Sequence, residues 1–323
     1  MVKRYPTVSV VIPTRFRPKA VCKAVRSVMA QTVPVLECIV VIDGPDAETI
    51  AALGQMDYAA LKVLALDENV GGSEARNLGA RAAEGEWVGY LDDDDEWLPE
   101  KLEKQLGLLE GVERPPQVLF SRYLDRGPKE DLLRPRRFLH AGETMSDYLM
   151  CNLSFLGGFE GCPQTSTWLI RRELLLKVPF TRGLKAFQDI DWLLHAFAVP
   201  GVYSLGAEES LVIFHNEKTS ARVSLKVDQR FCHEWGEANR EYFTAVAYGY
   251  YLVVFCLNRA VIEGKSRKLR WQLLREAGAV ARWPMKMSFL AGLYLFVYPM
   301  LRRCFSPRKL KVWMHSLIQW RRV

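Results

Sequence analysis

Short apolar runs alternate with amphipathic segments through the first third of the chain. The runs are rich in valine and isoleucine, which is typical of strands buried on both faces. They span residues 7–13, 36–42, 61–66 and 87–91. Helical segments are expected between them, at residues 18–31, at residues 47–54 and after Ser73. This alternation predicts an α/β protein whose mostly parallel sheet has helices on both faces.

A glycine pair precedes the third predicted helix, in the segment Asn69-Val70-Gly71-Gly72-Ser73. Glycine adopts backbone angles that other residues avoid, and serine is a common N-cap. We therefore expect Ser73 to cap the helix that follows.

The middle of the chain is less regular. Strand-like pieces occupy residues 117–123, 165–170 and 210–215. Residues 188–198 form an amphipathic stretch that predicts a helix.

Four consecutive aspartates, Asp92 to Asp95, follow the apolar run at residues 87–91. Adjacent ionised carboxylates repel one another, so such a cluster is costly unless a cation compensates it. Carboxylate oxygens suit Mg²⁺ or Mn²⁺, which commonly use substrate phosphates as further ligands. The cluster therefore predicts a metal–diphosphate site. The alternative is a solvated acidic turn that caps a helix beginning near Pro99.

Polar side chains also follow the first two predicted strands, namely Thr14, Arg15 and Asp43. Parallel strands end at the same edge of a sheet, and ligands of such sheets bind at that edge. We expect these side chains and the aspartates to line one crevice.

Charge is distributed unevenly along the 323 residues. The whole chain has a net charge of +7, whereas residues 259–323 alone carry +13 and the remainder −6. An acidic body with a basic tail indicates an anionic surface as a partner. Nucleic acid is not the expected partner, because no nucleic-acid-binding motif accompanies the basic residues.

Two uncharged apolar stretches, residues 242–257 and 287–301, lie in this C-terminal region. Both are shorter than the roughly 20 residues that a spanning helix needs. They indicate re-entrant or interfacial segments of a membrane-associated region, or core helices that pack on the rest of the protein. Tryptophans among the basic residues favour the headgroup region of an anionic bilayer.

The seven cysteines are scattered and show no C-x-x-C pair. This pattern indicates reduced thiols in the cytoplasm and no zinc site. The first residues show no signal-peptide core, so secretion is not expected.

The ordered motifs resemble those of the family 2 glycosyltransferases, which have the GT-A fold, a Rossmann-like sheet. The resemblance covers residues 7–222. It rests on Val8-Ser9-Val10-Val11-Ile12-Pro13-Thr14, Ser27-Val28-Met29-Ala30-Gln31-Thr32, Ile39-Val40-Val41-Ile42-Asp43-Gly44, Asn69-Val70-Gly71-Gly72-Ser73-Glu74-Ala75-Arg76-Asn77 and Leu91-Asp92-Asp93-Asp94-Asp95.

This resemblance implies an inverting enzyme that moves a sugar from a nucleotide diphosphate to an acceptor hydroxyl. Asp43 would bind the base, Asp92 the ribose and Asp94 a Mn²⁺ or Mg²⁺ ion. His215, in a segment similar to a late motif of the family, would approach the same ion. The implied nucleotide-sugar-binding residues are Pro13, Thr14, Arg15, Asp43, Arg76, Asp92 and Asp93.

Inversion also needs a base near the acceptor hydroxyl. Gln188-Asp189-Ile190-Asp191 is similar to the family's E-D-x-D pattern, so Asp189 is the expected base and Asp191 the alternative. Either residue could instead cap a helix. Gln188 replaces the usual glutamate, and the loss of that negative charge predicts a lower pKa for the base.

We therefore expect a catalytic domain over residues 1–225. Its nucleotide-sugar-binding half covers residues 1–115, and its acceptor half covers residues 116–225. A helical basic region over 226–323 would place the enzyme on the cytoplasmic face of the membrane, where it would glycosylate a glycan or lipid-linked acceptor. The alternatives are a sugar nucleotidylyltransferase, which a missing Gly-rich phosphate loop disfavours, and an inactive nucleotide-binding membrane scaffold.

Overall fold

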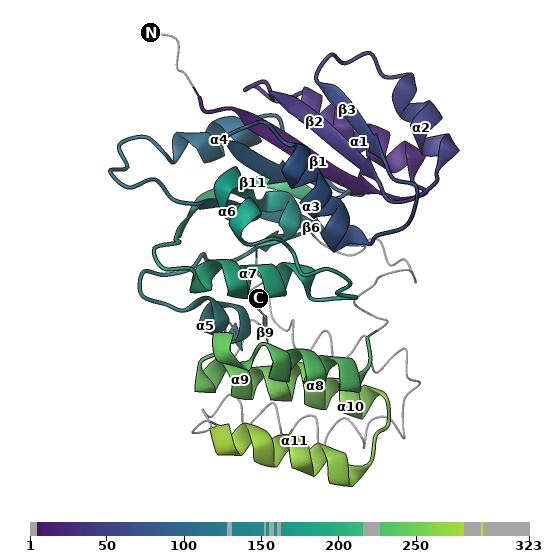
Figure 1. The fold of residues 1–323 in the computed structure, drawn as a ribbon. Coiled ribbons are helices and arrows are strands. Elements are labelled where there is room, and N and C mark those ends of the chain that lie inside the picture. The colour runs from purple at the N-terminus through teal and green to yellow at the C-terminus, as the bar shows by residue number, and fades with distance from the viewer. Residues whose placement is uncertain are drawn as a thin grey trace. The chain divides into compact units, whose positions relative to one another are not determined.

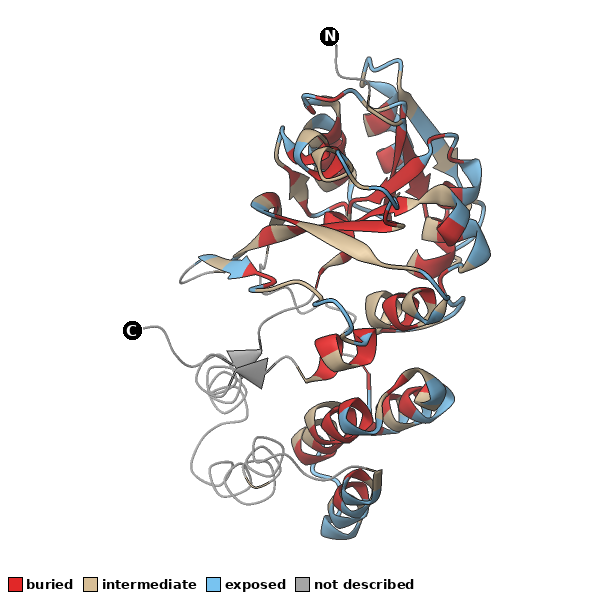
Figure 2. Cartoon of the chain, turned by 90° about the vertical axis from the view of Figure 1, so that its left-hand side faces the viewer, coloured by how far each residue is buried: buried red, intermediate tan, exposed pale blue. Residues whose placement is uncertain are grey.

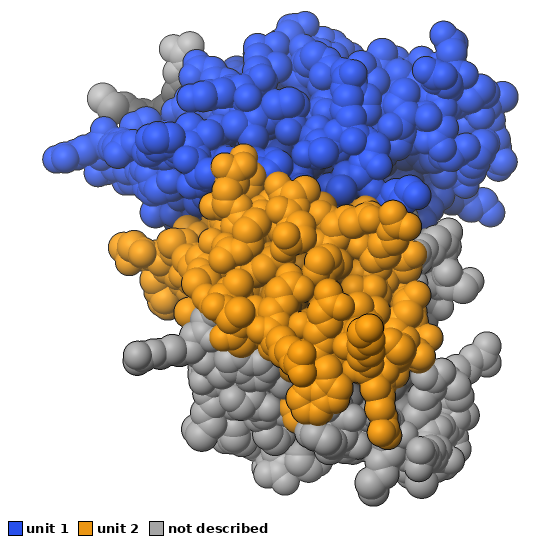
Figure 3. Space-filling model, turned by 60° about the horizontal axis from the view of Figure 1, so that its bottom comes forward, with its two compact units in different colours: residues 1–138, 162–220 blue, residues 139–161, 221–323 orange. Residues whose placement is uncertain are grey.

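The computed structural model describes residues 5–127, 131–151, 163–215 and 227–280, the backbone of 153–154 and 158–159, and residue 292. The chain forms two compact units (Figure 3). Unit 1 contains residues 1–138 and 162–220, and unit 2 contains residues 139–161 and 221–323. Residues 139–161 therefore belong with the C-terminal helices, whereas a single boundary at residue 225 would separate them.

Unit 1 is built around a sheet with the strand order β3-β2-β1-β4-β10-β6-β11-β5, in which β7 also pairs with β6 (Figure 1). Its strands are β1 (Val8–Thr14), β2 (Glu37–Ile42), β3 (Leu61–Ala65), β4 (Trp87–Tyr90), β5 (Glu96–Trp97), β6 (Val118–Arg126), β7 (Asp131–Arg134), β10 (Leu169–Arg171) and β11 (Ser204–His215). The first four strands pair in parallel, as do β6 and β11. β5, β7 and β10 run antiparallel to their neighbours.

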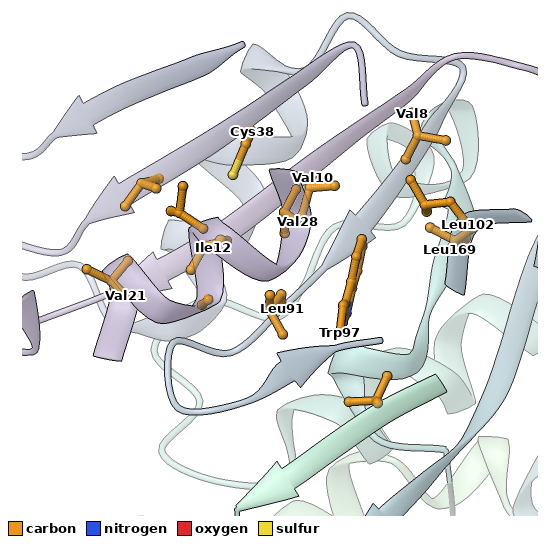
Figure 4. Close-up of a cluster of buried hydrophobic side chains, with 14 of the residues drawn as sticks. Val8, Val10, Ile12, Val21, Val28, Cys38, Leu91, Trp97, Leu102 and Leu169 are labelled. Atoms are coloured by element: carbon orange, nitrogen blue, oxygen red, sulfur yellow. The ribbon is translucent and has the colours of Figure 1, made fainter. Parts of the chain in front are cut away.

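Helices lie on both faces of this sheet, which confirms the predicted α/β fold. They are α1 (Pro18–Met29), α2 (Ala47–Gly54), α3 (Gly72–Ala82), α4 (Lys101–Gly107), α6 (Arg172–Lys177) and α7 (Gln188–Ala198). Val10 of β1 joins the core cluster that contains Val28 of α1 (Figure 4). Val11 points to the opposite face, as alternation along a strand requires, and there it packs against Gly79 of α3.

Buried residues concentrate in the strands of this sheet and on the helix faces that cover them (Figure 2). Gly89 of β4 illustrates how tightly the core is filled. A Cβ at this position would lie 2.6 Å from Trp97 and 2.9 Å from Leu169. Glycine is therefore required where β4 passes the indole ring that lies two residues beyond the aspartates.

One predicted strand is only partly correct. Residues 165–170 divide into a 3₁₀ turn, η1 (Thr165–Thr167), and β10. The Thr167 hydroxyl donates to the Gln164 carbonyl oxygen at 2.7 Å, and Ser166 bonds Asp95 instead of a neighbouring strand. Local hydroxyl bonds of this kind compete with sheet pairing.

The predicted N-cap of α3 is wrong. The cap is Gly71, whose φ of 83° favours glycine, and Ser73 lies inside the first turn. The Asp43 carboxylate accepts from the backbone N–H of Val70 at 2.7 Å and of Gly71 at 3.1 Å. A side chain that is distant in sequence therefore holds the loop that leads into α3, and α3 itself has no side-chain cap.

In the part of unit 2 that the structure describes, the elements are helical apart from two short antiparallel strands, β8 (Leu153–Ser154) and β9 (Gly158–Phe159). Its helical elements are α5 (Met145–Met150), α8 (Gln229–Ala238), η3 (Arg240–Tyr242), α9 (Ala245–Tyr251), the π-helical segment η4 (Leu252–Leu257), α10 (Asn258–Ile262) and α11 (Arg267–Val280). Aromatic rings of Trp235, Phe243 and Tyr251 pack together in it.

One helix in the described part of the chain, Ala245–Ile262, is long and apolar enough to cross a membrane, and 61% of it is buried inside the protein. The apolar stretch predicted at 242–257 thus contributes largely to the core of unit 2. The second stretch, 287–301, lies outside the described residues apart from residue 292, and so do all basic residues after 280.

Candidate functional site

The carboxyl ends of β1, β2 and β4 meet in unit 1, as the sequence predicts. The Thr14 hydroxyl donates to Asp93 Oδ2 at 2.7 Å, and the Asp43 backbone N–H donates to the Thr14 carbonyl oxygen at 2.9 Å. Pro13 stands in β1 beside Val41 of β2. The parallel register of these strands therefore gathers the predicted polar residues at one edge.

Arg17 compensates two of the four aspartates. Its Nη1 lies 2.8 Å from Asp93 Oδ1 and 2.8 Å from Asp94 Oδ2. Asp93 is buried and Asp94 exposed. Burial raises the pKa of Asp93 to about 6, although the Thr14 hydroxyl and Arg17 oppose that rise. A positive charge is thus already present where the sequence predicts that the carboxylates need one.

Asp95 connects the aspartate loop, residues Asp92 to Asp95, to the rest of unit 1. Its Oδ2 accepts from Ser166 Oγ at 2.6 Å and from Gln164 Nε2 at 2.5 Å. Ser166 Oγ in turn accepts from the backbone N–H of Asp92 at 3.0 Å. Burial, and then the nearby Asp92, raise the pKa of Asp95 well above its usual value. The Asp95 Oδ1 atom is buried without a hydrogen-bond partner.

Arg76 connects the aspartate loop with α7. Its Nη2 donates to Asp92 Oδ1 at 2.5 Å, and its Nη1 donates to Gln188 Oε1 at 3.0 Å. A Cβ at Gly72 would lie 3.2 Å from Arg76 Nη1 and 3.3 Å from Gln188 Oε1, so glycine leaves room for this bridge. The first residue of α7 is thereby held beside the predicted donor site.

Asp189 follows Gln188 in the first turn of α7 and is half-buried. Its Oδ1 accepts from the Ile190 backbone N–H at 2.9 Å. Burial raises the pKa of Asp189; the nearby positive charge of Arg76 lowers it, and Asp92 raises it further. The lower pKa expected from Gln188 is therefore outweighed by desolvation.

Asp191 occupies a different environment from Asp189. It is buried, its Oδ2 accepts from the Thr181 hydroxyl at 2.6 Å, and His195 Nδ1 lies 3.6 Å away. These contacts tie Asp191 to neighbouring elements within unit 1.

His215 ends β11, which pairs with β5 just beyond the aspartates. Its Nε2 lies 3.6 Å from Glu96 Oε2 and 3.4 Å from Lys23 Nζ, and Lys23 Nζ lies 2.7 Å from the same Glu96 oxygen. The strand pairing thus brings His215 to the end of the aspartate loop, where its contacts are with Glu96 and Lys23.

Two phenylalanines with left-handed backbone angles flank the site. Phe16 has a φ of 53° and Phe187 a φ of 64°, and in the described residues no other non-glycine residue has a positive φ. Arg15, a predicted binding residue, lies with its guanidinium 5.0 Å from the Phe16 ring centre. Strained angles of this kind concentrate at functional sites.

Several site residues were missing from the sequence prediction, above all Arg17, Gln164 and Ser166. Gln164 and Ser166 precede β10 and act through long-range contacts that periodicity does not encode. Arg17 offers a weak signal, because it lies two residues after Arg15, which is expected to line the crevice.

The fold and this strand-end site define a glycosyltransferase of the GT-A class. Residues 9–177 match the glycosyl transferase family 2 model, and the chain belongs to this family. Family membership therefore favours a glycosyltransferase over the nucleotidylyltransferase that the sequence left open.

Three relatives illustrate the family. An uncharacterized glycosyltransferase of Haemophilus influenzae is 26% identical over 69% of this chain and 73% of its own length. The amylovoran biosynthesis glycosyltransferase AmsB of Erwinia amylovora is 30% identical over 58% of this chain and 63% of its own length. The putative teichuronic acid biosynthesis glycosyltransferase TuaG of Bacillus subtilis is 34% identical over 44% of this chain and 55% of its own length.

Two solved structures share the fold. TarS 1-349 of S. aureus, in complex with UDP-GlcNAc, has a TM-score of 0.63 at 18% identity and covers 88% of this chain and 83% of that one. The mannosyltransferase PcManGT of Pyrobaculum calidifontis, in complex with GDP-Man and Mn²⁺, has a TM-score of 0.52 at 17% identity and covers 98% and 85% of the two chains.

Proposed function

We propose that this glycosyltransferase transfers a sugar, with inversion, from a nucleotide diphosphate to an acceptor hydroxyl, with Asp189 as the general base. The observation that carries the proposal is the Arg76 bridge, which joins Asp92 of the aspartate loop to Gln188, the neighbour of Asp189. The bridge holds the base beside the residues that would bind the donor. The nucleotide-sugar complexes of TarS and PcManGT support a donor of this class.

The chemistry requires one proton transfer and one displacement. Asp189 accepts the proton of the acceptor hydroxyl while that oxygen bonds the anomeric carbon. The bond from the anomeric carbon to the diphosphate breaks, and the diphosphate leaves with the electron pair. A base with a pKa above that of a free aspartate is better matched to this proton transfer near neutral pH.

The donor set of the aspartate loop fits a divalent cation. Asp93 Oδ1 and Asp94 Oδ2 lie at equal distances, 2.8 Å, from one guanidinium nitrogen, so both already face a shared positive charge. Carboxylate oxygens are the ligands that Mn²⁺ and Mg²⁺ prefer. Asp94, together with His215 as the family resemblance implies, would hold the ion, which when bound would neutralise charge on the leaving diphosphate.

The donor pocket would use the remaining residues of the strand ends. Thr14 orients Asp93 and Asp43 orders the loop before α3, while Pro13 and Arg15 border the same edge. In the proposed pocket Asp43 faces the base and Asp92 the ribose.

The proposed acceptor is a glycan or a lipid-linked sugar in cell-surface polysaccharide synthesis. The names of AmsB and TuaG place those relatives in amylovoran and teichuronic acid biosynthesis. The charge of +13 over residues 259–323 favours an anionic membrane surface, and hence the cytoplasmic face of the membrane, as the place of action.

A donor screen followed by two substitutions tests this proposal. Purified protein with Mn²⁺ is incubated with nucleotide sugars, and release of the nucleoside diphosphate is measured. Asp189→Asn is expected to lower turnover by about 10²- to 10⁴-fold, the usual contribution of a general base, and to leave nucleotide affinity unchanged. Asp94→Asn is expected to weaken nucleotide binding that depends on Mn²⁺.

Asp191→Asn serves as the matched control for Asp189→Asn, because Asp191 lies in the same turn but is bound to Thr181. We expect it to lower stability more than turnover. Equal loss of nucleotide binding in the Asp94 and Asp189 variants would contradict the assigned roles. A wild-type protein that binds nucleotides and neither hydrolyses nor transfers any sugar would instead identify an inactive scaffold.

A further inference from the structure

Three side chains that can bind a metal ion converge in unit 2, outside the proposed donor site. His233 and Glu237 are four residues apart on α8, so they share a face of that helix, and Glu276 lies on α11. The His233 Nε2 atom is 3.2 Å from Oε1 and 3.0 Å from Oε2 of Glu276. One ligand atom from each of the three residues lies within 4.8 Å of the other two. The two helices thus bring one imidazole and two carboxylates together.

The carboxylates of this cluster have no strongly basic partner. In the part of the chain that the structure describes, no lysine or arginine is ion-paired with Glu237 or Glu276. This is unexpected for Glu276, because residues 259–323 contain 15 Lys or Arg and only one other acid, Glu263, which pairs with Lys265. Neighbouring ionised carboxylates repel one another, and imidazole loses its charge as the pH rises from about 5 to 8. A bound cation would therefore stabilise the cluster.

Tyr248 of α9 orients one of the two carboxylates. Its hydroxyl donates to Glu237 Oε1, its ring is buried, and the Arg240 guanidinium lies 4.4 Å from the ring centre. Burial raises the pKa of Tyr248, and the negative charges of Glu237 and Glu276 raise it further. Carboxylates that bind metal ions are commonly held by a hydrogen bond of this kind. Glu237 is also exposed, which gives an ion access from solvent.

The backbone beside the cluster has an unusual geometry. The segment η4 is π-helical and packs against both α8 and α11. π-Helical segments are rare, and they occur frequently at functional sites. The irregular turn therefore lies against the two helices that carry the three side chains.

We propose that His233, Glu237 and Glu276 bind a Zn²⁺ ion that links α8 to α11. Imidazole and carboxylate groups are typical zinc ligands, whereas Mg²⁺ and Ca²⁺ prefer oxygen ligands alone. Ligand atoms at about 2.0 to 2.2 Å from a tetrahedral zinc ion lie about 3.3 Å from one another. The separations of 3.0 and 3.2 Å between His233 and Glu276 are close to this value. The cysteine spacing argues only against a thiolate site.

This ion is separate from the cation proposed for the donor. Its ligands belong to unit 2, whereas those of the donor cation belong to unit 1. It would stabilise the packing of α11, which directly precedes the basic segment 281–323.

Calorimetric titration of the full-length protein with ZnCl₂, after removal of metal with EDTA and dialysis, tests the proposal. Replacing a residue that only orients a metal ligand typically lowers metal affinity about 10- to 100-fold, and we expect this result for Tyr248→Phe. His233→Gln and Glu276→Gln remove ligands themselves, so each should lower zinc affinity by more than about 100-fold.

Two control variants separate this site from other carboxylates. Glu234→Gln is the matched control, because Glu234 is a carboxylate of α8 that pairs with Arg230. Asp94→Asn alters the proposed donor cation site in unit 1. Both variants should retain the zinc affinity that the wild type shows for the site in unit 2.

Thermal unfolding gives a second readout. Zinc that binds only the folded state raises the Tm by mass action, so ZnCl₂ should raise the Tm of the wild type and EDTA should reverse the rise. His233→Gln and Glu276→Gln should lack this zinc-dependent rise. The difference with and without zinc is measured within each variant, so a variant that is merely less stable still reports on the site.

Four outcomes would overturn the proposal. One is equal zinc affinity in the wild type, His233→Gln and Glu276→Gln, and another is a wild type that gives neither heat nor a Tm change with zinc. An equal loss in Glu234→Gln would show that scattered carboxylates bind the ion, and a loss of the response in Asp94→Asn would place the ion at the donor site.

Discussion

At the scale of single residues, the site depends on carboxyl groups whose charge is costly. Asp93, Asp95 and Asp189 all have pKa values raised first by burial. Arg17 and Arg76 offset part of that cost from opposite ends of the aspartate loop. A site that must bind a cation or a phosphate retains such groups although they destabilise the protein without ligand.

Asp93 gives a pH prediction whose sign can be derived. Its pKa in the folded protein is about 6, whereas a free aspartate has a pKa of about 3.9. Between these values the folded state binds more protons than the unfolded state. The stability contribution of Asp93 is therefore present below about pH 4 and is lost as the pH rises through about 6. The free energy of unfolding falls by about 3 kcal/mol over this range.

Replacing Asp93 by asparagine should remove this dependence, since asparagine does not ionise. The free energy of unfolding, measured in urea at several pH values without metal, should fall less between pH 4 and 6 in Asp93→Asn than in the wild type. Asp67→Asn, an exposed aspartate in the same unit, should behave as the wild type does. Parallel pH profiles for the wild type and Asp93→Asn would contradict the prediction.

At the scale of elements, the start of α3 shows how a side chain of the proposed donor site can also support the fold. Asp43 accepts the backbone N–H groups of Val70 and Gly71 just before the helix. Hydrogen bonds to a charged group typically contribute about 1.5 to 3 kcal/mol. We expect Asp43→Ala to destabilise unit 1 by this amount and Ser73→Ala to change stability by less than about 0.5 kcal/mol.

Urea unfolding followed by tryptophan fluorescence measures both variants. The comparison is matched in position, because both substitutions remove a polar group near the same helix start. A larger loss for Ser73→Ala than for Asp43→Ala would contradict the role of Asp43 in holding the start of α3.

Much of the fold could be predicted from periodicity because local patterns determine it. The parallel strands of the N-terminal half and the helix at 188–198 follow from burial on one or both faces. The convergence of Thr14, Asp43 and Asp93 follows from strand direction alone. The bonds of Asp43 to the loop before α3 and the contacts of Arg17, Gln164 and Ser166 could not be predicted, because each joins residues that only the tertiary fold brings together.

At the scale of the whole molecule, charge separates the acidic body from the basic C-terminal region. Residues 281–323 carry nine Lys or Arg residues and no Asp or Glu. Each basic residue near an anionic bilayer contributes about 1 kcal/mol to binding, and salt screens this attraction. We therefore expect the full chain to sediment with phosphatidylglycerol vesicles at low salt and to be released at high salt.

Phosphatidylcholine vesicles are the control for apolar insertion. Binding to both lipids that salt does not weaken would indicate insertion of apolar segments instead of electrostatic attraction. Failure to bind either lipid would contradict the proposed location at the membrane.

The chain passes between its two units three times, because residues 139–161 belong with the C-terminal helices. In unit 2, Thr244 Oγ1 donates to Asp147 of α5 at 2.6 Å, and Tyr148 of α5 is fully buried. A shortened protein that stopped at residue 225 would lack the C-terminal helices of unit 2. The apolar side chains of α5, such as Tyr148, would then be exposed and prone to aggregation. Truncating the enzyme at that point would therefore yield an insoluble fragment, and unit 1 has to be produced together with unit 2.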